Sequence, residues 1–402
     1  MTGAKRPRVS FARVGLSVAG LLLVVEFLDE LVFGTREAAW PLVRDDLGLS
    51  YAEVGLLLAL PNLASAVLEP AFGMLGDTRR RGLLVAGGGV AYGAALVAFA
   101  GAPGFAVALM ASLVLYPASG AFVSLSQASL MDTDPERTEQ LMARWAFAGS
   151  AGVVVGPLLL GLAVAGGAGW RGAFIACAVG ALALALPAGR RPAAAAAATS
   201  PATVADAVRS AREVARRPAT WRWLTLLGFS DLMLDVFLGF LALYFVDVAG
   251  TSERTAGMAV ITWSVVGLAG DGLLMLLLER LPGLRYLRWS ARVMVVLFPA
   301  FLLAPWLAGK LVLLGAIGLV NAGWYAILKA QLYREFPGQS GGVVAVYSLF
   351  TSVTGLAPAV IGLAAQRWGL DTAMWLLLAG PLALVAGIPR NSNRRADVAG
   401  EE

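Results

Sequence analysis

The chain contains no histidine and a single cysteine, Cys177, which lies within an apolar stretch. A disulfide within one chain needs two cysteines, and Cys/His metal sites and histidine-dependent triads need residues that this sequence does not have. These absences exclude a disulfide framework, a Cys/His metal site and a proton relay through histidine. Because the sequence also has no nucleophile and base motif, we expect a protein that is not an enzyme and has no cofactor or metal.

Charge is also scarce. Only 14% of the 402 residues are charged and 58% are hydrophobic, whereas soluble globular proteins have about 25% charged residues. This composition indicates a membrane protein whose partners include the lipid bilayer. The net charge of +5 does not indicate nucleic-acid binding, because the basic residues are confined to loop ends and no polar domain carries them.

The apolar residues form runs that are close to the 20 residues a helix needs to cross a bilayer. The first run begins at Val14, after four basic residues, and continues to Gly34 without a cleavage pattern, so we interpret it as an uncleaved first span. The other runs cover 50–74, 82–101, 104–131, 138–165, 171–188, 221–247, 254–278, 288–308, 310–334, 340–366 and 370–389. The sequence therefore predicts an all-α membrane protein with twelve transmembrane helices.

These runs divide the chain into an N-terminal bundle, 1–188, a linker, 189–220, and a C-terminal bundle, 221–402. Within the linker, Ser200 and Pro201 can begin a helix with valines and alanines on one side and Arg209, Arg212 and Arg216 on the other. Such a helix would lie on the membrane surface. A solvated tether between the bundles is an equally good interpretation.

Lysine and arginine mark the cytoplasmic side of a membrane protein. If both termini are cytoplasmic, all but six of the 31 basic residues fall on that side, and the six are Arg36, Arg44, Arg171, Arg254, Lys310 and Arg367. We therefore expect a multi-pass protein of the plasma membrane, which in a bacterium is the inner membrane, with both termini in the cytoplasm. We expect it to act as a monomer.

A short stretch after the second run ends the apolar sequence abruptly. The glycines Gly73 and Gly76 allow a second helix to approach, and Asp77 is followed by the basic residues Arg79, Arg80 and Arg81. Such a joint could lock helices together on the cytoplasmic side. A shift of 202 positions carries Asp77 onto Glu279, and it also relates Glu69 to Asp271, Gly55 to Gly257, Ser50 to Ser252 and Asp29 to Asp231. The shift predicts two similarly folded halves.

The joint resembles the signature loop of the major facilitator superfamily, G-x-L-A-D-R-x-G-R, although Thr78 replaces the first arginine and the second glycine comes late, at Gly82. The resemblance implies two pseudo-symmetric six-helix bundles that expose a central site to each side in turn, with spans 1, 4, 7 and 10 around it. By this resemblance, Asp77 and the arginines would close the cytoplasmic side, with Glu279 and Arg280 as the weaker second copy.

Span five contains Gly152, Gly156 and Pro157, which resemble the G-x-x-x-G-P motif of the superfamily's exporters. Glycines four residues apart form a groove for a partner helix, and proline bends a span. Span eleven has Gly355 and Pro358 in the equivalent place. We interpret both sets as gating elements, while close packing without a role in gating is the alternative.

Acidic residues inside membrane spans are rare because each is costly there. Glu26, Asp29 and Glu30 share one face of span one, and Asp231 and Asp235 lie one turn apart in span seven. Acids close together in a medium of low dielectric suit a proton carrier. We expect this cluster to bind protons and substrate, with Gln127, Asn321 and Lys329 as polar partners, although salt bridges that only hold the fold are an alternative.

The order of residues in span one, Pro41 before the second span and a fourth span rich in small residues are most similar to the drug-exporting, fosmidomycin-resistance-like branch of the family. Together these patterns predict a secondary transporter that exports a small amphiphilic or cationic compound in exchange for protons. One alternative is a proton-coupled importer of a small nutrient. A second alternative, from another class, is a transporter fold that serves as a sensor or handles lipids without proton coupling.

Overall fold

The computed structural model describes residues 18–76, 81–131, 133, 138–190, 212–278, 280–335, 346–347, 350 and 353–389. Every regular element in these residues is helical. The elements of the first half are α1 Val18–Leu47, α2 Tyr51–Gly76, α3 Arg81–Ala100, α4 Phe105–Ser119, η1 Gly120–Ser124, α5 Leu125–Met131, α6 Thr138–Ala165 and α7 Gly169–Gly189. Those of the second half are α9 Pro218–Asp231, η3 Leu232–Val236, α10 Phe237–Leu243, η4 Tyr244–Val248, α11 Glu253–Leu278, α12 Gly283–Leu303, α13 Leu307–Asn321, α14 Trp324–Arg334, α16 Ala357–Trp368, α17 Leu370–Met374, η5 Trp375–Leu378 and α18 Ala379–Gly387.

Within these residues, 10 segments are long and apolar enough to cross a membrane. The helix α1 is 30 residues long but carries more charge than the others, and α16 ends the segment expected to form span eleven. With these two, the arrangement agrees with the twelve spans expected. The protein is therefore an all-α membrane protein.

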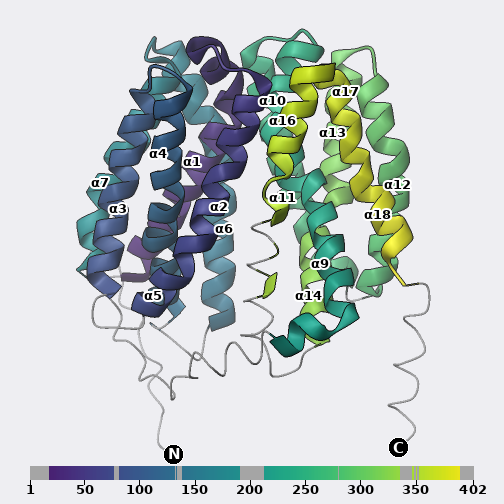
Figure 1. The fold of residues 1–402 in the computed structure, drawn as a ribbon, viewed down its shortest axis with the longest axis horizontal. Coiled ribbons are helices and arrows are strands. Elements are labelled where there is room, and N and C mark those ends of the chain that lie inside the picture. Colours follow the sequence, from purple (N-terminus) through teal and green to yellow (C-terminus); the bar gives the residue numbers. More distant parts are fainter. Residues whose placement is uncertain are drawn as a thin grey trace, which may run out of the picture.

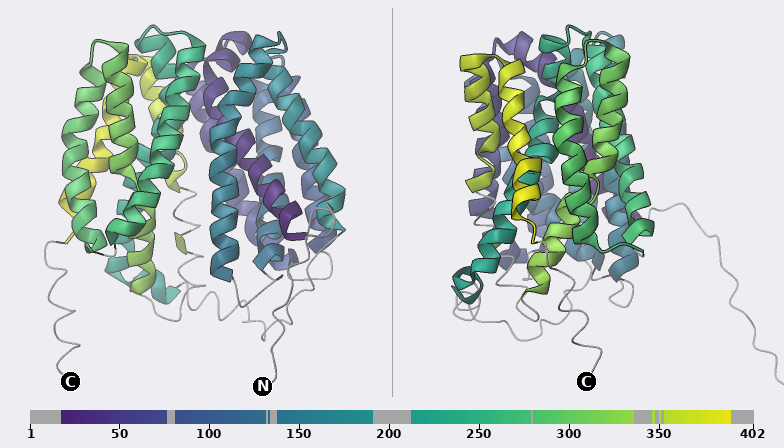
Figure 2. Two further views of the ribbon diagram at one scale, coloured as in Figure 1. Left: turned by 180° about the vertical axis from the view of Figure 1, so that it is seen from behind. Right: turned by 90° about the vertical axis from the view of Figure 1, so that its right-hand side faces the viewer.

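The helices stand side by side in two groups, α1 to α7 and α9 to α18, and the view from behind shows the same two groups (Figures 1 and 2). Each span, whether one helix or several consecutive segments, runs from one end of the bundle to the other, so the loops alternate between two ends. We call the end at the top of Figure 1 the Arg44 end and the opposite end the Arg81 end.

Two expected span boundaries were wrong. The first helix continues beyond Gly34 to Leu47, because Arg36 and Glu37 form an ion pair inside the helix instead of marking its end. The ninth span is 283–303 and not 288–308, because the helix begins directly after Pro282 and includes Arg285 and Arg288. Both errors come from reading charged residues as loops.

Three of the central spans depart from regular α-helix. The fourth contains the π-helical turn η1, and the seventh contains two such turns, η3 and η4. The tenth is interrupted between α13 and α14, where Ala322 is extended and Gly323 has a φ of +70°. Because π-helical turns and breaks in helices often occur at functional sites, these positions direct attention to the centre of the molecule.

Glycine brings α1 and α6 into backbone contact. A Cβ atom at Gly152 would lie 2.4 Å from the carbonyl oxygen of Phe27, and one at Gly156 would lie 2.4 Å from the amide nitrogen of Thr35. Gly34 on α1 is equally close to the backbone of α6 at Val153. The partner helix of the glycine groove is therefore α1, while the role of Gly152, Gly156 and Pro157 in gating stays a prediction.

Polar contacts join the two halves at the Arg44 end. Arg44 forms an ion pair with Asp247, and the Tyr51 hydroxyl donates a hydrogen bond to the same carboxylate over 2.9 Å. The backbone amide of Tyr51 donates to Gln366 over 3.2 Å. One helical turn further in, Gly362 of α16 lies against the backbone of α2 at Tyr51 and Gly55. The halves are therefore closed against each other at this end.

Much of the expected linker helix lies in 191–211, outside the described residues. Of its described part, Val214 is fully buried, and the Thr220 hydroxyl donates a 2.6 Å hydrogen bond to the Val214 carbonyl. The end of the linker therefore packs against the start of α9. The three-part division of the chain, with boundaries at 188 and 220, stays a prediction.

Candidate functional site: a charged cavity between the halves

A cavity of about 320 Å³ lies between the two halves. Its walls come from α1, α2, α3, α4, η1, η3 and the start of α16. Its charged and polar lining residues are Asp29, Glu30, Arg36, Glu37, Asn62, Ser65, Tyr92, Tyr116, Ser119, Ser124 and Asp235. Four carboxylates and one guanidinium therefore share this space, and the site is acidic if all of them are ionised.

Asp29 is held in place by hydroxyl groups from neighbouring helices. The Ser119 hydroxyl of α4 donates a 2.8 Å hydrogen bond to Asp29 Oδ1, and the Tyr92 hydroxyl of α3 is a second hydrogen-bond partner. Ser119 directly precedes the π-helical turn η1. A neutral hydroxyl leaves the charge of the carboxylate uncompensated, so Asp29 can still bind a proton or a cation.

Arg36 is the basic residue of the cavity, and aromatic rings surround it. Its guanidinium donates hydrogen bonds to Glu37 Oε1, at 2.7 and 3.0 Å, and a further one to the Tyr116 hydroxyl. It also lies 5.1 Å from the ring centres of Phe33 and Tyr116. Cation–π contacts of this kind stabilise a cation away from water. Glu37 is only 2% exposed and its second oxygen, Oε2, has no hydrogen-bond partner among the described residues.

The remaining expected acids divide into three groups. Glu30 and Asp235 line the cavity, one from each half. Glu26 is 8% exposed and its carboxylate lies against Gly149 and Trp145 of α6, away from the cavity lining. Asp231 is outside the lining as well, and the charges that act on it are those of Asp235 and Lys329. The structure therefore brings Asp29, Glu30 and Asp235 together in the cavity lining and leaves Asp231 outside it, within electrostatic reach of Asp235.

Lys329 belongs to a tyrosine cluster in the second half. Its ammonium donates a 2.6 Å hydrogen bond to the Tyr325 hydroxyl, which also accepts a 3.0 Å hydrogen bond from Tyr347. The ammonium lies 4.8 and 5.0 Å from the centres of these two rings. Lys329 is therefore stabilised mainly by aromatic rings, and its charge also acts on Asp231.

Asn321 lines a second cavity, of about 310 Å³, at the break between α13 and α14. Its amide nitrogen donates to the Met233 carbonyl over 3.2 Å, and its oxygen has no partner in the described part of the chain. Asp271, on α11, accepts a 3.0 Å hydrogen bond from the amide of Gly323 and so caps the start of α14. Trp324, which is fully buried, and Tyr325 line this cavity as well.

Several expected site residues lie elsewhere. Gln127 is on α5 and does not line either cavity. Gly355 lies in a turn before α16, and Pro358 begins that helix at the edge of the first cavity. Arg81 is buried at the start of α3, and Arg280 is exposed. Asp77, Arg79, Arg80 and Glu279 lie outside the described residues, as do the side chain of Glu69 and the surroundings of Gly73 and Gly76, so the proposed cytoplasmic lock stays a prediction.

The sequence interpretation missed the most strongly paired group, Arg36 and Glu37, and the hydroxyls of Tyr92, Tyr116 and Ser119. The apolar run that follows, Ala38 to Val43, is the available signal, because it shows that the first helix continues past the two charges. The proline of this run lies within α1 and does not separate the first two spans. The hydroxyl residues give no such signal, since isolated tyrosines and serines are common in membrane helices.

Comparison with known proteins identifies the fold. The family model of the Major Facilitator Superfamily matches residues 22–357. Among solved structures, a bacterial homologue of the human lysosomal transporter Spinster, in an inward-facing and occupied conformation, is 15% identical with a TM-score of 0.74, over 92% of this chain and 93% of that one. Its inward-facing, unoccupied conformation gives a TM-score of 0.76 at 15% identity, over 92% and 95% of the two chains.

The nucleoside transporter NupG is similar to the same extent, with 13% identity and a TM-score of 0.75 over 92% of this chain and 98% of that one. At these identities the likeness shows the fold alone. No curated protein sequence matches the chain.

Proposed function

Because the chain belongs to the major facilitator superfamily and is a membrane transporter of that type, we propose that it exports a small amphiphilic cation in exchange for protons by alternating access. The observation that supports this proposal is the charge of the central cavity. Asp29, Glu30 and Asp235 line it, and its one guanidinium, Arg36, is already bound to Glu37. Three carboxylates without a matching cation among the described lining residues favour a positively charged substrate.

Aromatic rings supply the other half of the recognition. Phe33, Tyr92 and Tyr116 line the same cavity, together with Leu58 and Leu115. A ligand with a positive charge and an apolar body would place its charge against the carboxylates and its body against these side chains. The drug-exporter branch of the family is the assignment that agrees with such a substrate.

Exchange with protons follows from the same arrangement. Protonation of Asp29 and binding of a cation both neutralise the same negative site. A bound proton therefore lowers the affinity for the cation, and a bound cation lowers the affinity for the proton by the same free energy. The acids of the cavity would release their protons when the cation arrives. In the next step, protons from the other side would displace the cation.

The orientation of the cycle rests on the distribution of basic residues. Lysine and arginine are concentrated at the Arg81 end, so we place that end, with both termini, in the cytoplasm of a bacterial inner membrane. The contacts of Arg44, Tyr51 and Asp247 then close the external side. The structure would accordingly be the inward-facing state of a monomeric carrier.

Reconstituted liposomes can test this proposal. The probe is 1-methyl-4-phenylpyridinium, whose permanent charge prevents simple trapping as a weak base. We expect an acidic lumen to drive its accumulation, abolition of that accumulation by nigericin, and loss of it in Asp29→Asn. Asp371→Asn, which changes an exposed carboxylate at the Arg44 end, serves as the matched control and retains uptake.

A neutral probe separates the main alternative. If a pH gradient of the opposite sign, with an alkaline lumen, drives accumulation of uridine and neither gradient drives accumulation of the cation, the protein is a proton-coupled importer and the proposal is wrong. Cation uptake that is the same with and without a pH gradient would instead rule out proton exchange.

A further inference from the structure

The outer face of α12 carries two arginines that face away from the protein. Arg285, Trp289 and Arg292 follow one another at spacings of four and three residues, so they share one side of the helix. All three are exposed, Trp289 to 57%, and Val296 and Leu303 continue the same side with 72% and 70% exposure. The opposite side, with Leu287, Ala291, Met294 and Phe298, is buried.

This face is directed at the bilayer. In both Figure 1 and the view from behind in Figure 2, α12 stands at the edge of the second half, on the side away from the first half. The helix is 21 residues long, which corresponds to about 31 Å and therefore to the whole hydrocarbon core. Arg292 lies nine residues after the start, at a depth of about 13 Å along the helix.

The described part of the protein provides no counter-charge for these arginines. Neither the Arg285 nor the Arg292 side chain has a hydrogen bond or an ion pair with another residue that the structure describes. The α12 sequence contains no acidic residue, and neither do α13, α14, α18 and η5, which pack against it. An arginine at such a depth is costly unless a negative group accompanies it.

We propose that this face of α12 binds an anionic phospholipid, with the phosphodiester of the headgroup between Arg285 and Arg292 and its acyl chains along Val296. Helical side chains point toward the N-terminus of their helix. The Arg292 guanidinium is therefore directed toward the Arg81 end, where the phosphate groups of that leaflet lie. Guanidinium groups pair with phosphate through two parallel hydrogen bonds.

Fluorescence of Trp289 can report the lipid beside it. The full-length protein is reconstituted in phosphatidylcholine that contains an equal fraction of brominated phosphatidylglycerol or of brominated phosphatidylcholine, and the signal of Trp289 is obtained by difference from Trp289→Phe. We expect brominated phosphatidylglycerol to quench Trp289 more strongly. Arg285→Gln and Arg292→Gln should each lower that preference by about five-fold, because one basic residue near a membrane contributes about 1 kcal/mol toward anionic lipid.

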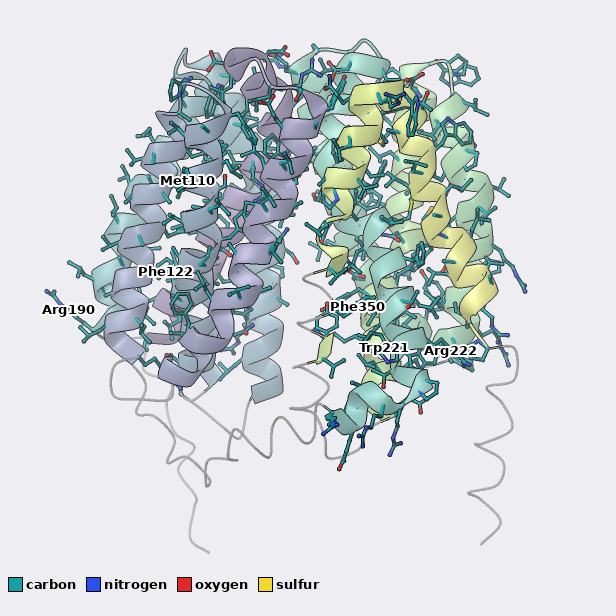
Figure 3. All side chains as sticks on the ribbon, viewed as in Figure 1. Met110, Phe122, Arg190, Trp221, Arg222 and Phe350 are labelled. Carbon is teal, nitrogen blue, oxygen red and sulfur yellow. The ribbon has the colours of Figure 1, made fainter. Side chains whose placement is uncertain are left out.

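Two further variants separate lipid binding at this face from a general effect of surface charge. Arg292→Lys keeps the charge and should keep most of the preference, and its fold can be checked by size-exclusion chromatography. Arg190→Gln removes an exposed arginine on the far side of the molecule (Figure 3) and should leave quenching of Trp289 unchanged.

Equal quenching by the two brominated lipids in the wild-type protein would overturn the proposal, because the arginines would then reach water without a lipid partner. An equal loss of preference in Arg190→Gln and Arg292→Gln would also overturn it, since it would indicate general surface charge. Protection of Trp289 from both brominated lipids would show that a protein, such as a second copy of this chain, covers the face instead.

Discussion

The central helices of the two halves occupy equivalent places but carry different chemistry. A shift of 202 residues relates Asp29 on α1 to Asp231 in the seventh span, whereas Arg36 and Glu37 correspond to Leu238 and Gly239. Glu37 in fact lies against its own counterpart, because its Oε2 is 3.5 Å from the position of a Cβ atom at Gly239. The repeat has kept the fold of the two halves, while the ion pair is present in the first half alone.

The same contrast holds for the interruptions of the fourth and tenth spans. Residues 120–124 form the π-helical turn η1, and the equivalent residues, 322–326, contain the break between α13 and α14. In the first half Ser119, directly before the π-helical turn, donates a hydrogen bond to Asp29. In the second half Asp271 is consumed in capping the broken helix. Equivalent irregularities therefore serve the cavity in one half and the backbone in the other.

The largest loss of stability should come from removal of one member of the ion pair between Arg36 and Glu37. Arg36→Gln leaves Glu37 buried without its partner, and loss of one partner of a buried pair costs about 3–5 kcal/mol. We expect a large fall in the apparent melting temperature, measured by the loss of monodisperse protein on heating in detergent. The double variant Arg36→Gln/Glu37→Gln should regain most of the lost melting temperature. A double variant no more stable than Arg36→Gln would show that the unpaired Glu37 does not cause the loss of stability.

The next comparison is between the two equivalent acids. Asp29 lines the cavity and Asp231 lies beside Lys329, so Asp29→Asn should remove most of the proton release that accompanies cation binding, whereas Asp231→Asn should preserve it. Protons compete with the cation, so wild-type affinity should fall as the pH falls, by up to about ten-fold per pH unit for a single proton. A pH-sensitive dye and detergent-solubilised protein are sufficient for the measurement.

If Asp231→Asn abolishes proton release and Asp29→Asn does not, the second half carries the proton and the contrast between the halves is reversed. Affinity that does not vary between acidic and neutral pH in the wild-type protein would exclude proton competition at this site altogether.

A smaller effect is expected from the contact between α1 and α6. Gly156→Val would force a side chain against the backbone of Leu31 and Thr35, and overpacking of this kind typically costs about 1–3 kcal/mol. Gly161→Val, on the same helix, has no neighbouring atom within 4 Å and is the matched control. The equivalent of Gly156 in the second half is Pro358, and its helix, α16, makes its close backbone contact with α2 at Gly55. Equal melting temperatures for the two glycine variants would contradict the role of Gly156.

Much of this architecture is predictable from the sequence because hydrophobic runs and the repeat both report on the backbone. The fifth span is expected at 138–165 and found there, since its apolar run is long and ends in glycines. The first span failed because Arg36 and Glu37 neutralise each other inside the helix, and a one-dimensional pattern does not show which charges are paired. For the same reason Glu26 and Asp29, three residues apart, look alike in sequence but face α6 and the cavity respectively.

The smallest change should be in the balance between the closed and open states of the Arg44 end, where the two halves meet. Asp247 binds both Arg44 and Tyr51, and these groups are partly exposed, so the ion pair contributes at most about 1 kcal/mol. Asp247→Asn should therefore shift the balance toward opening at this end by no more than about five-fold. Spin labels at positions 45 and 252, in a Cys177→Ser background, would report the opening as a longer distance population. Asp371→Asn changes another acid at the same end, one that forms no ion pair with the first half among the described residues, and it should leave the distances as they are. If Asp247→Asn also leaves them unchanged, then the glycine contact between α2 and α16 is what holds this end closed.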